Sequence, residues 1–327
     1  MVDEAPFETG EAGNLLSRIL DDVREATKRA ERAGNAERER AILRREDLFP
    51  LIEREDERLI VYHARFNADR GGIEDPDIPF LTSLLHPIGT PRRLALMIHS
   101  PGGAGELAEK IVDICRSHCQ EEFSVIVAGK AKSAATLIAL GSDTLLMGYT
   151  SELGPTDPQV QLVAGGVVRR ISAFSVIRAR QELMREMTEA ATSGTDFSGI
   201  VAQLTMSTME PAFVGECQRM VDFSYDFASK SLRRWMLRNL NPEWNAQRIG
   251  AAARRIANNF LSSHQRFSHG RMIGPQECIE IGLNVNRLER DATRWLAIQE
   301  LHARCDTMLA ERDTNKIIFT QESILYG

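Results

Sequence analysis

The sequence predicts an α/β fold with a parallel sheet of repeated β-α units and helical N- and C-terminal extensions. Short apolar runs have the length and composition of buried strands; they lie at residues 59–66, 94–98, 123–128 and 144–147. Helical patterns separate these runs, at 104–118 and 133–140 among others. Strands that alternate with helices in this way form parallel sheets with right-handed crossovers. With 327 residues and 43% hydrophobic content, the chain can bury a full core.

Beyond residue 158 the pattern is mainly helical. Amphipathic helices are expected at 171–187, 210–238 and 242–260, and a long helix at 289–312 precedes a short strand at 316–320. The predicted organisation is therefore a charged helical extension over residues 1–50, a main domain over 51–290, and a C-terminal helix and tail over 291–327.

Composition excludes several classes of protein. A net charge of −6 and a pI near 5.8 argue against nucleic-acid binding. The sequence has no run of eighteen uncharged apolar residues and no apolar core near its acidic N-terminus, so we expect no membrane span, no secretory signal and a cytoplasmic location. The five cysteines are scattered, which is typical of reduced thiols. Cys115 and Cys119 flank His118 on a predicted helix but have no second ligand pair nearby, so we expect neither a metal nor a cofactor.

Two motifs follow buried strands and carry the chemistry. Residues 98–103 read Ile-His-Ser-Pro-Gly-Gly, and residues 129–135 read Gly-Lys-Ala-Lys-Ser-Ala-Ala. The first leaves backbone N–H groups in a loop without Cβ atoms, and the second places a hydroxyl on a tight turn at a helix N-terminus. Because ligands bind at the carboxyl ends of parallel strands, the two motifs together offer a nucleophile and a site for an oxyanion.

These motifs resemble the superfamily of the Clp proteolytic subunit, signal peptide peptidase A and the crotonases. Residues 151–159 and 269–277 look like the serine dehydrogenase proteinase branch, and residues 280–285 resemble the segment that closes this fold. The resemblance covers about residues 55 to 290 and implies a serine peptidase domain. It also implies that Ser133 is the nucleophile and that the oxyanion hole consists of N–H groups from three residues, Gly102, Gly103 and Ala134.

The general base departs from the patterns of these relatives. In the place of a histidine of the Clp branch, residues 154–156 read Gly-Pro-Thr. Where the signal peptide peptidase branch has a lysine, residues 173–188 contain Arg178, Arg180 and Arg185 but no lysine, and arginine holds its proton at neutral pH. His269 falls near the position of the third Clp triad residue, and His264 shares its segment. Two further candidate bases are His99, which strand alternation directs away from Ser100, and Lys230, which would need burial.

Other polar residues near the motifs have structural alternatives. Asp157 could orient a base, although an aspartate before proline commonly forms a turn. Ser100 could act as nucleophile or shape the glycine loop. Lys130 and Lys132 flank the serine as charges.

The expected function is hydrolysis of peptide bonds through an acyl-enzyme on Ser133. Two alternatives stay open: a non-catalytic oligomeric scaffold, which the missing base favours, and a crotonase-like acyl-CoA enzyme. The expected partners are a peptide or protein substrate and further copies of the chain, joined through helical faces such as the apolar stripe within residues 15–23. The sequence has no ATP-binding motif, so an unfoldase or regulatory partner would be a separate chain.

Overall fold

A computed structural model describes residues 35–327, except for residues 69, 165, 194–209 and 263–269, together with six residues of the N-terminal segment: Ser17, Asp21, Asp22, Arg24, Glu25 and Lys28. No described helix combines the length and the apolarity needed to cross a bilayer.

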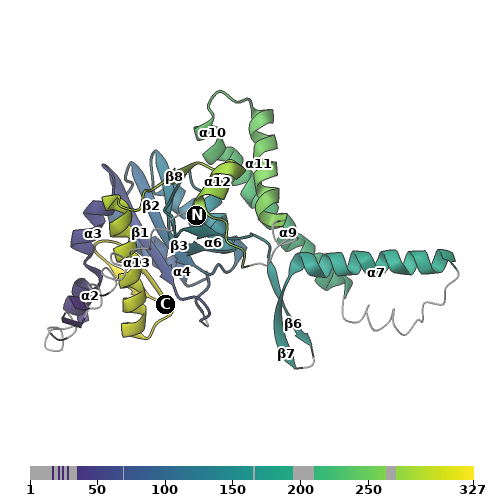
Figure 1. Cartoon of the computed structure of the whole chain (residues 1–327), viewed down its shortest axis with the longest axis horizontal. Coiled ribbons are helices and arrows are strands. Elements are labelled where there is room, and N and C mark those ends of the chain that lie inside the picture. Colours follow the sequence, from purple (N-terminus) through teal and green to yellow (C-terminus); the bar gives the residue numbers. More distant parts are fainter. Residues whose placement is uncertain are drawn as a thin grey trace, which may run out of the picture.

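Within this part of the chain, one sheet of eight strands forms the centre of the molecule (Figure 1). Its strand order is β10-β9-β1-β2-β3-β4-β8. The short strand β5 pairs with the C-terminal end of β3, past the residues of β3 that pair with β4. The inner strands are parallel, whereas β9 pairs antiparallel with both β1 and β10. The strands are β1 (Glu57–Ala64), β2 (Arg93–Ser100), β3 (Glu122–Ala131), β4 (Thr144–Met147), β5 (Glu152–Leu153), β8 (Val285–Arg287), β9 (Lys316–Phe319) and β10 (Ile324–Tyr326).

Helices cover both faces of the sheet because its strands are apolar on both sides. On one face, a core that includes Ile60, Leu96 and Val125 packs against five helices: α4 (Asp77–Ile88), α5 (Gly105–Ser117), α6 (Ala134–Leu140), α9 (Pro211–Arg234) and α11 (Ala246–Ser262). The short helices α10 (Met236–Leu240) and α12 (Pro275–Ile281) adjoin this layer. The opposite face, which includes Val61 and Met97, packs against α2 (Asn35–Leu43), α3 (Arg45–Ile52) and α13 (Thr293–Arg312).

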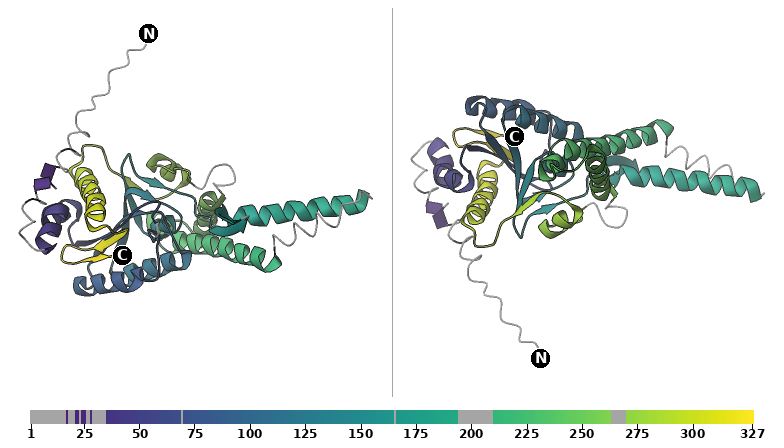
Figure 2. Two further views of the ribbon diagram at one scale, coloured as in Figure 1. Left: turned by 90° about the horizontal axis from the view of Figure 1, so that it is seen from below. Right: turned by 90° about the horizontal axis from the view of Figure 1, so that it is seen from above.

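An arm projects from this body (Figures 1 and 2). It begins with an antiparallel hairpin of β6 (Gln159–Ala164) and β7 (Val167–Ser172) and continues into α7 (Ala173–Ser193). A small separate core that includes Val176 and Val221 joins α7 to α9.

A buried ion pair joins β9 to the start of α4. Lys316 Nζ lies 2.8 Å and 2.9 Å from the two carboxylate oxygens of Asp77, and both side chains are 2% exposed. The Tyr62 hydroxyl donates to Asp77 as well, at 2.8 Å. Burial, followed by the charge of Asp77, raises the pKa of Tyr62, so the phenol remains a hydrogen-bond donor.

The α/β architecture predicted from the sequence is confirmed, with local corrections. The segment after residue 158 is not helical at first, because β6 and β7 form a hairpin there. At the C-terminus β9 pairs antiparallel with β1, β10 forms the edge of the sheet beside β9, and α13 packs on one face of the sheet. The α7 helix begins at Ala173 and extends to Ser193, six residues beyond the end expected at residue 187. The apolar residues of the 15–23 stripe lie outside the described residues.

Candidate active site

Ser133 occupies a strained turn between β3 and α6. Its backbone angles are φ 52° and ψ −117°, a region that residues with a Cβ rarely adopt. The α6 helix begins at the next residue, and Leu137 N–H donates to the Ser133 carbonyl at 3.1 Å. A sharp strand-turn-helix of this kind exposes the serine hydroxyl at the N-terminus of the helix.

Gly102 lies directly beneath this turn. A Cβ on Gly102 would lie 2.7 Å from the Ser133 Cβ and 2.7 Å from the Lys132 carbonyl oxygen, and its φ is +103°. Backbone conformation and space therefore both require glycine here.

Gly103 is held from the other side by Ile73. Its φ is +149°, and a Cβ on Gly103 would lie 2.3 Å from Ile73 N. Ile73 N–H donates to the Gly102 carbonyl at 2.7 Å, while Ala104 N–H donates to the Ile73 carbonyl at 3.1 Å. The segment before α4 thus pairs with the glycine loop and sets its position beside Ser133.

Ser100 joins the two motifs. It is fully buried, its Oγ accepts the Gly102 N–H at 3.2 Å, and its carbonyl accepts the Lys132 N–H at 3.1 Å. The Gly102 N–H already donates to Ser100 Oγ. The N–H groups of Gly103 and Ala134 are therefore the better candidates to donate to an oxyanion. The Ala134 N–H lies in the first turn of α6 and has no intrahelical acceptor.

A cavity of about 840 Å³ opens at Ser133, and Gly103 and Ala134 also line it. Thr156 contributes a buried hydroxyl that has no hydrogen-bond partner among the described residues. No histidine or lysine is among the described lining residues, whose charged members are Arg70, Glu74, Glu106 and Arg170 and whose larger apolar members are Ile73, Leu137, Met220 and Phe223.

The candidate bases are dispersed. His99 contacts α13 on the far face of the sheet: its ring lies 4.5 Å from that of His302, and its Nδ1 accepts the Lys130 N–H at 3.1 Å. Burial, with the charges of His63 and His302, lowers the pKa of His99 to about 2. Lys230 is exposed on α9, outside the cavity lining. His264 and His269 lie outside the described residues.

Two further polar side chains near Ser133 are buried beside the cavity. Asp157 is 0% exposed and follows Thr156 without lining the cavity. Lys132 Nζ donates to the carbonyls of Leu153 and Arg271 at 3.0 Å and 3.1 Å and pairs with Glu152 at 3.1 Å. Burial lowers the pKa of Lys132 even though Glu152 opposes this effect. These contacts fix the Lys132 ammonium group beside the two residues of β5.

Sequence reasoning did not single out Ile73, although its pairing positions the glycine loop. The signal was weak, because Gly71 and Gly72 before it indicated only a loop. Phe223 and Met220 were likewise seen only as part of a helix, and their place in the cavity depends on how α9 crosses α6.

The mostly parallel sheet, the serine turn and the glycine loop define an α/β protein that carries a serine and a glycine loop at the carboxyl ends of neighbouring strands. Residues 84–192, about a third of the chain, match the model of the ClpP-like SDH-type serine proteinase family. The resemblance inferred from the motifs is thereby confirmed.

Two curated relatives are uncharacterized proteins of Methanocaldococcus jannaschii. One is 40% identical over 90 residues, which cover 27% of this chain and 31% of the relative. The other is 37% identical over 65 residues, which cover 20% and 22%. The chain therefore matches less than a third of the length of these relatives.

The structural comparison finds the 1510-N membrane-bound stomatin-specific protease in two mutant forms. One form is 13% identical with a TM-score of 0.36 and covers 66% of this chain and 75% of that chain. The other, in complex with a substrate peptide, is 15% identical with a TM-score of 0.37 and covers 66% and 71%.

Proposed function

We propose that the protein is a serine peptidase that hydrolyses peptide bonds through an acyl-enzyme on Ser133. The observation that carries this proposal is the strained Ser133 turn, which adjoins the Gly103 and Ala134 N–H groups at one cavity. A positive φ at a serine costs folding free energy, and such strain concentrates at functional sites. A peptide or protein substrate is the partner that this cavity would accept.

In the proposed reaction Ser133 Oγ attacks the scissile carbonyl, and a base removes the hydroxyl proton. The tetrahedral oxyanion accepts hydrogen bonds from Gly103 N–H and Ala134 N–H. Collapse breaks the C–N bond, and the base returns its proton to the leaving amine. Water then attacks the ester, and Ser133 leaves as the free hydroxyl while the acid product departs.

For the base we keep His269 as the proposal, with His264 second. His99 contacts α13 and Lys230 is exposed outside the cavity lining, which makes both weaker candidates. His269→Ala should lose more peptidase activity than Lys230→Met. A histidine base should make the rate rise through roughly pH 6 to 7. Equal activity of His269→Ala and the wild type across that range would reject the assignment.

The nucleophile is tested by covalent labelling. A fluorophosphonate should modify the wild-type chain once, with the adduct on Ser133 by mass spectrometry, and Ser133→Ala should not be labelled. Ser83→Ala is the matched control, because Ser83 is exposed on α4 away from the cavity. Undiminished labelling of Ser133→Ala would remove Ser133 from the role.

A non-catalytic scaffold is the second candidate, and one observation favours it: the described lining of the cavity holds no histidine or lysine that could serve as base. A scaffold should resist fluorophosphonate at Ser133 and cleave no peptide, while assembling normally. Labelling at Ser133 together with peptide turnover would reject it.

We also propose assembly into a homo-oligomer. The arm carries exposed apolar side chains: Val167 is 54% exposed, Val168 60% and Met184 43%. Burying them between copies would remove this surface from water. Light scattering coupled to size exclusion tests this, and a single mass of 36.6 kDa at micromolar concentration would contradict it. A separate ATP-dependent unfoldase or regulatory chain is a further proposed partner.

A further inference from the structure

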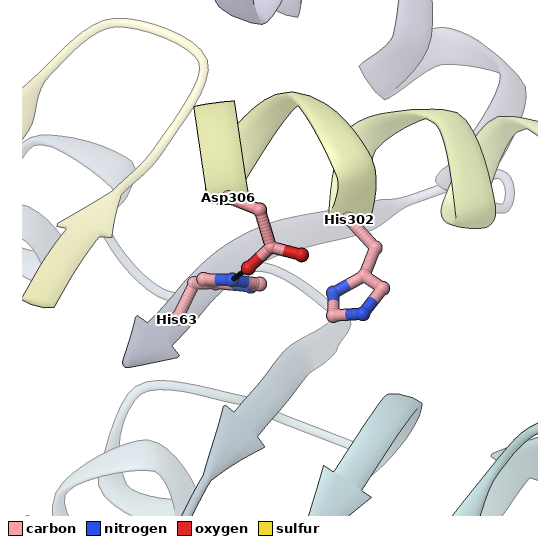
Figure 3. A group of neighbouring side chains, drawn as sticks. All are labelled: His63, His302 and Asp306. Carbon is pink, nitrogen blue, oxygen red and sulfur yellow. Dashed lines mark hydrogen bonds and ion pairs between the residues drawn. The ribbon is translucent and has the colours of Figure 1, made fainter. Parts of the chain in front are cut away.

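A cluster of imidazoles and one carboxylate lies between the sheet and α13, on the face opposite α6 and α9. His63 comes from the end of β1, and His302 and Asp306 lie one helical turn apart on α13 (Figure 3). His63 Nε2 and Asp306 Oδ1 are 2.8 Å apart. One ligand atom from each of the three residues lies within 4.8 Å of the other two.

We propose that His63, His302 and Asp306 bind one divalent first-row transition-metal ion, with Zn²⁺ the expected ion. Two imidazoles and one carboxylate are a ligand set that suits first-row transition-metal ions, whereas Mg²⁺ and Ca²⁺ prefer oxygen ligands alone. Zinc bonds of about 2.0–2.2 Å hold neighbouring ligand atoms some 3.0–3.5 Å apart. The ion would therefore open the His63–Asp306 contact slightly and draw His302 inward.

The ring nitrogens support this assignment. His302 Nδ1 is buried and has no hydrogen-bond partner among the described residues. In Figure 3 one ring nitrogen of His302 faces the His63–Asp306 pair, and the other faces away. The latter is Nε2, which lies beside Gly129: a Cβ there would come within 3.0 Å of it. A buried nitrogen without a partner is costly, and a metal bond to His302 Nδ1 would satisfy it.

His99 is excluded as a ligand, although its ring stacks on that of His63 with centroids 4.7 Å apart. Because its Nδ1 accepts the Lys130 N–H, its single proton resides on Nε2, and neither nitrogen offers a free lone pair. His99 instead packs its ring against those of His63 and His302. The carboxylate side is open, since the Asp306 side chain is 61% exposed and gives an ion access from solvent. Three protein ligands also leave a coordination position for water.

The test uses the full chain, stripped with EDTA and dialysed. Titration with Zn²⁺ by calorimetry should give one ion per chain, and Co²⁺ should show visible absorption of a nitrogen- and oxygen-ligated site. Asp306→Asn and His302→Gln should each weaken Zn²⁺ binding at least about tenfold. Asp306 is largely exposed, so its variant should keep the wild-type circular dichroism spectrum.

Matched controls separate this site from adventitious binding. Asp313→Asn, at the exposed left-handed C-cap of the same helix, should leave binding unchanged. Cys119→Ser tests whether zinc binds instead at Cys115, on α5, and Cys119, just beyond the end of that helix. The proposal is overturned if the wild type binds no stoichiometric Zn²⁺, if Asp306→Asn and His302→Gln bind it as the wild type does, or if Cys119→Ser is the variant that loses it.

Discussion

The backbone of Gly102 packs against the side chain of Ser133, so closely that a Cβ on the glycine would lie 2.7 Å from that of the serine. The two motifs, which the sequence separates by a whole β-α unit, are therefore one structural element. A substitution at Gly102 should therefore change the position of Ser133, and a substitution at Ser133 should change that of the glycine loop.

Gly102→Ala should slow fluorophosphonate labelling of Ser133 by at least about a hundredfold, the scale of losing one oxyanion donor. The added methyl would displace Ser133 or the loop, and with it the Gly103 N–H. The control is Gly89→Ala, because Gly89 also has a positive φ, of +72°, but nothing lies within 4 Å of its Cβ position. Equal labelling rates for the two variants would show that crowding at Ser133 is unimportant.

Ser133→Gly should abolish labelling yet raise the free energy of unfolding by up to about 2.5 kcal/mol. Glycine relieves a backbone strain of about 1–3 kcal/mol, less the entropy that glycine adds to the unfolded chain. Ser133→Ala keeps the strain and should unfold like the wild type. Urea unfolding of the three proteins measures the difference, and a glycine variant less stable than the alanine variant would contradict it.

Lys316→Met should cost about 3–5 kcal/mol of folding stability, because it leaves the buried Asp77 carboxylate without its cation. The double variant Lys316→Met/Asp77→Asn should recover part of this loss, since it removes the uncompensated charge. Lys110→Met, on the exposed side of α5, serves as the control. Urea midpoints compare the variants, and the double variant is expected to unfold later than Lys316→Met.

Cys119 should react slowly with iodoacetamide at pH 8, because burial raises its pKa to about 11 and outweighs the charge of Arg116. The thiolate is the reactive form, so the rate should climb as pH rises toward that value. The other four cysteines are buried and should stay unmodified in the native chain. Cys119→Ser should lack the alkaline reaction, and urea should expose every remaining thiol. Rapid modification at pH 8 would show the pKa to be near normal.

Much of the sheet could be predicted because its strands are short apolar runs bounded by turns. The expected strand at 94–98 lies within β2, and the expected helix at 104–118 matches α5 closely. The β6–β7 hairpin was missed, although Val160 and Leu162 alternate with glutamines and two glycines, Gly165 and Gly166, follow. Weak strand signals in a polar segment were outweighed by the helix pattern that begins at Ala173.

Other features depended on contacts that no local pattern contains. Ser133 and the glycine loop were predicted because each lies at the end of a strand. His63 and His302 meet only because α13 crosses the end of β1, far apart in sequence. A partial signal existed, since His302 and Asp306 are spaced i,i+4 on a predicted helix, but their partner could not be identified without the fold.

Neighbouring residues of β2 serve opposite sides of the sheet: His99 stacks with the imidazoles at α13, while Ser100 Oγ supports the Gly102 backbone. Because side chains along a strand alternate, deleting or inserting one residue in β2 would exchange the two sides throughout the strand. Both the serine turn and the imidazole cluster would then be lost in one step. Among homologous sequences, this strand should therefore vary in side-chain identity but keep its length, whereas the tip of the β6–β7 hairpin is a place where length can change at little cost.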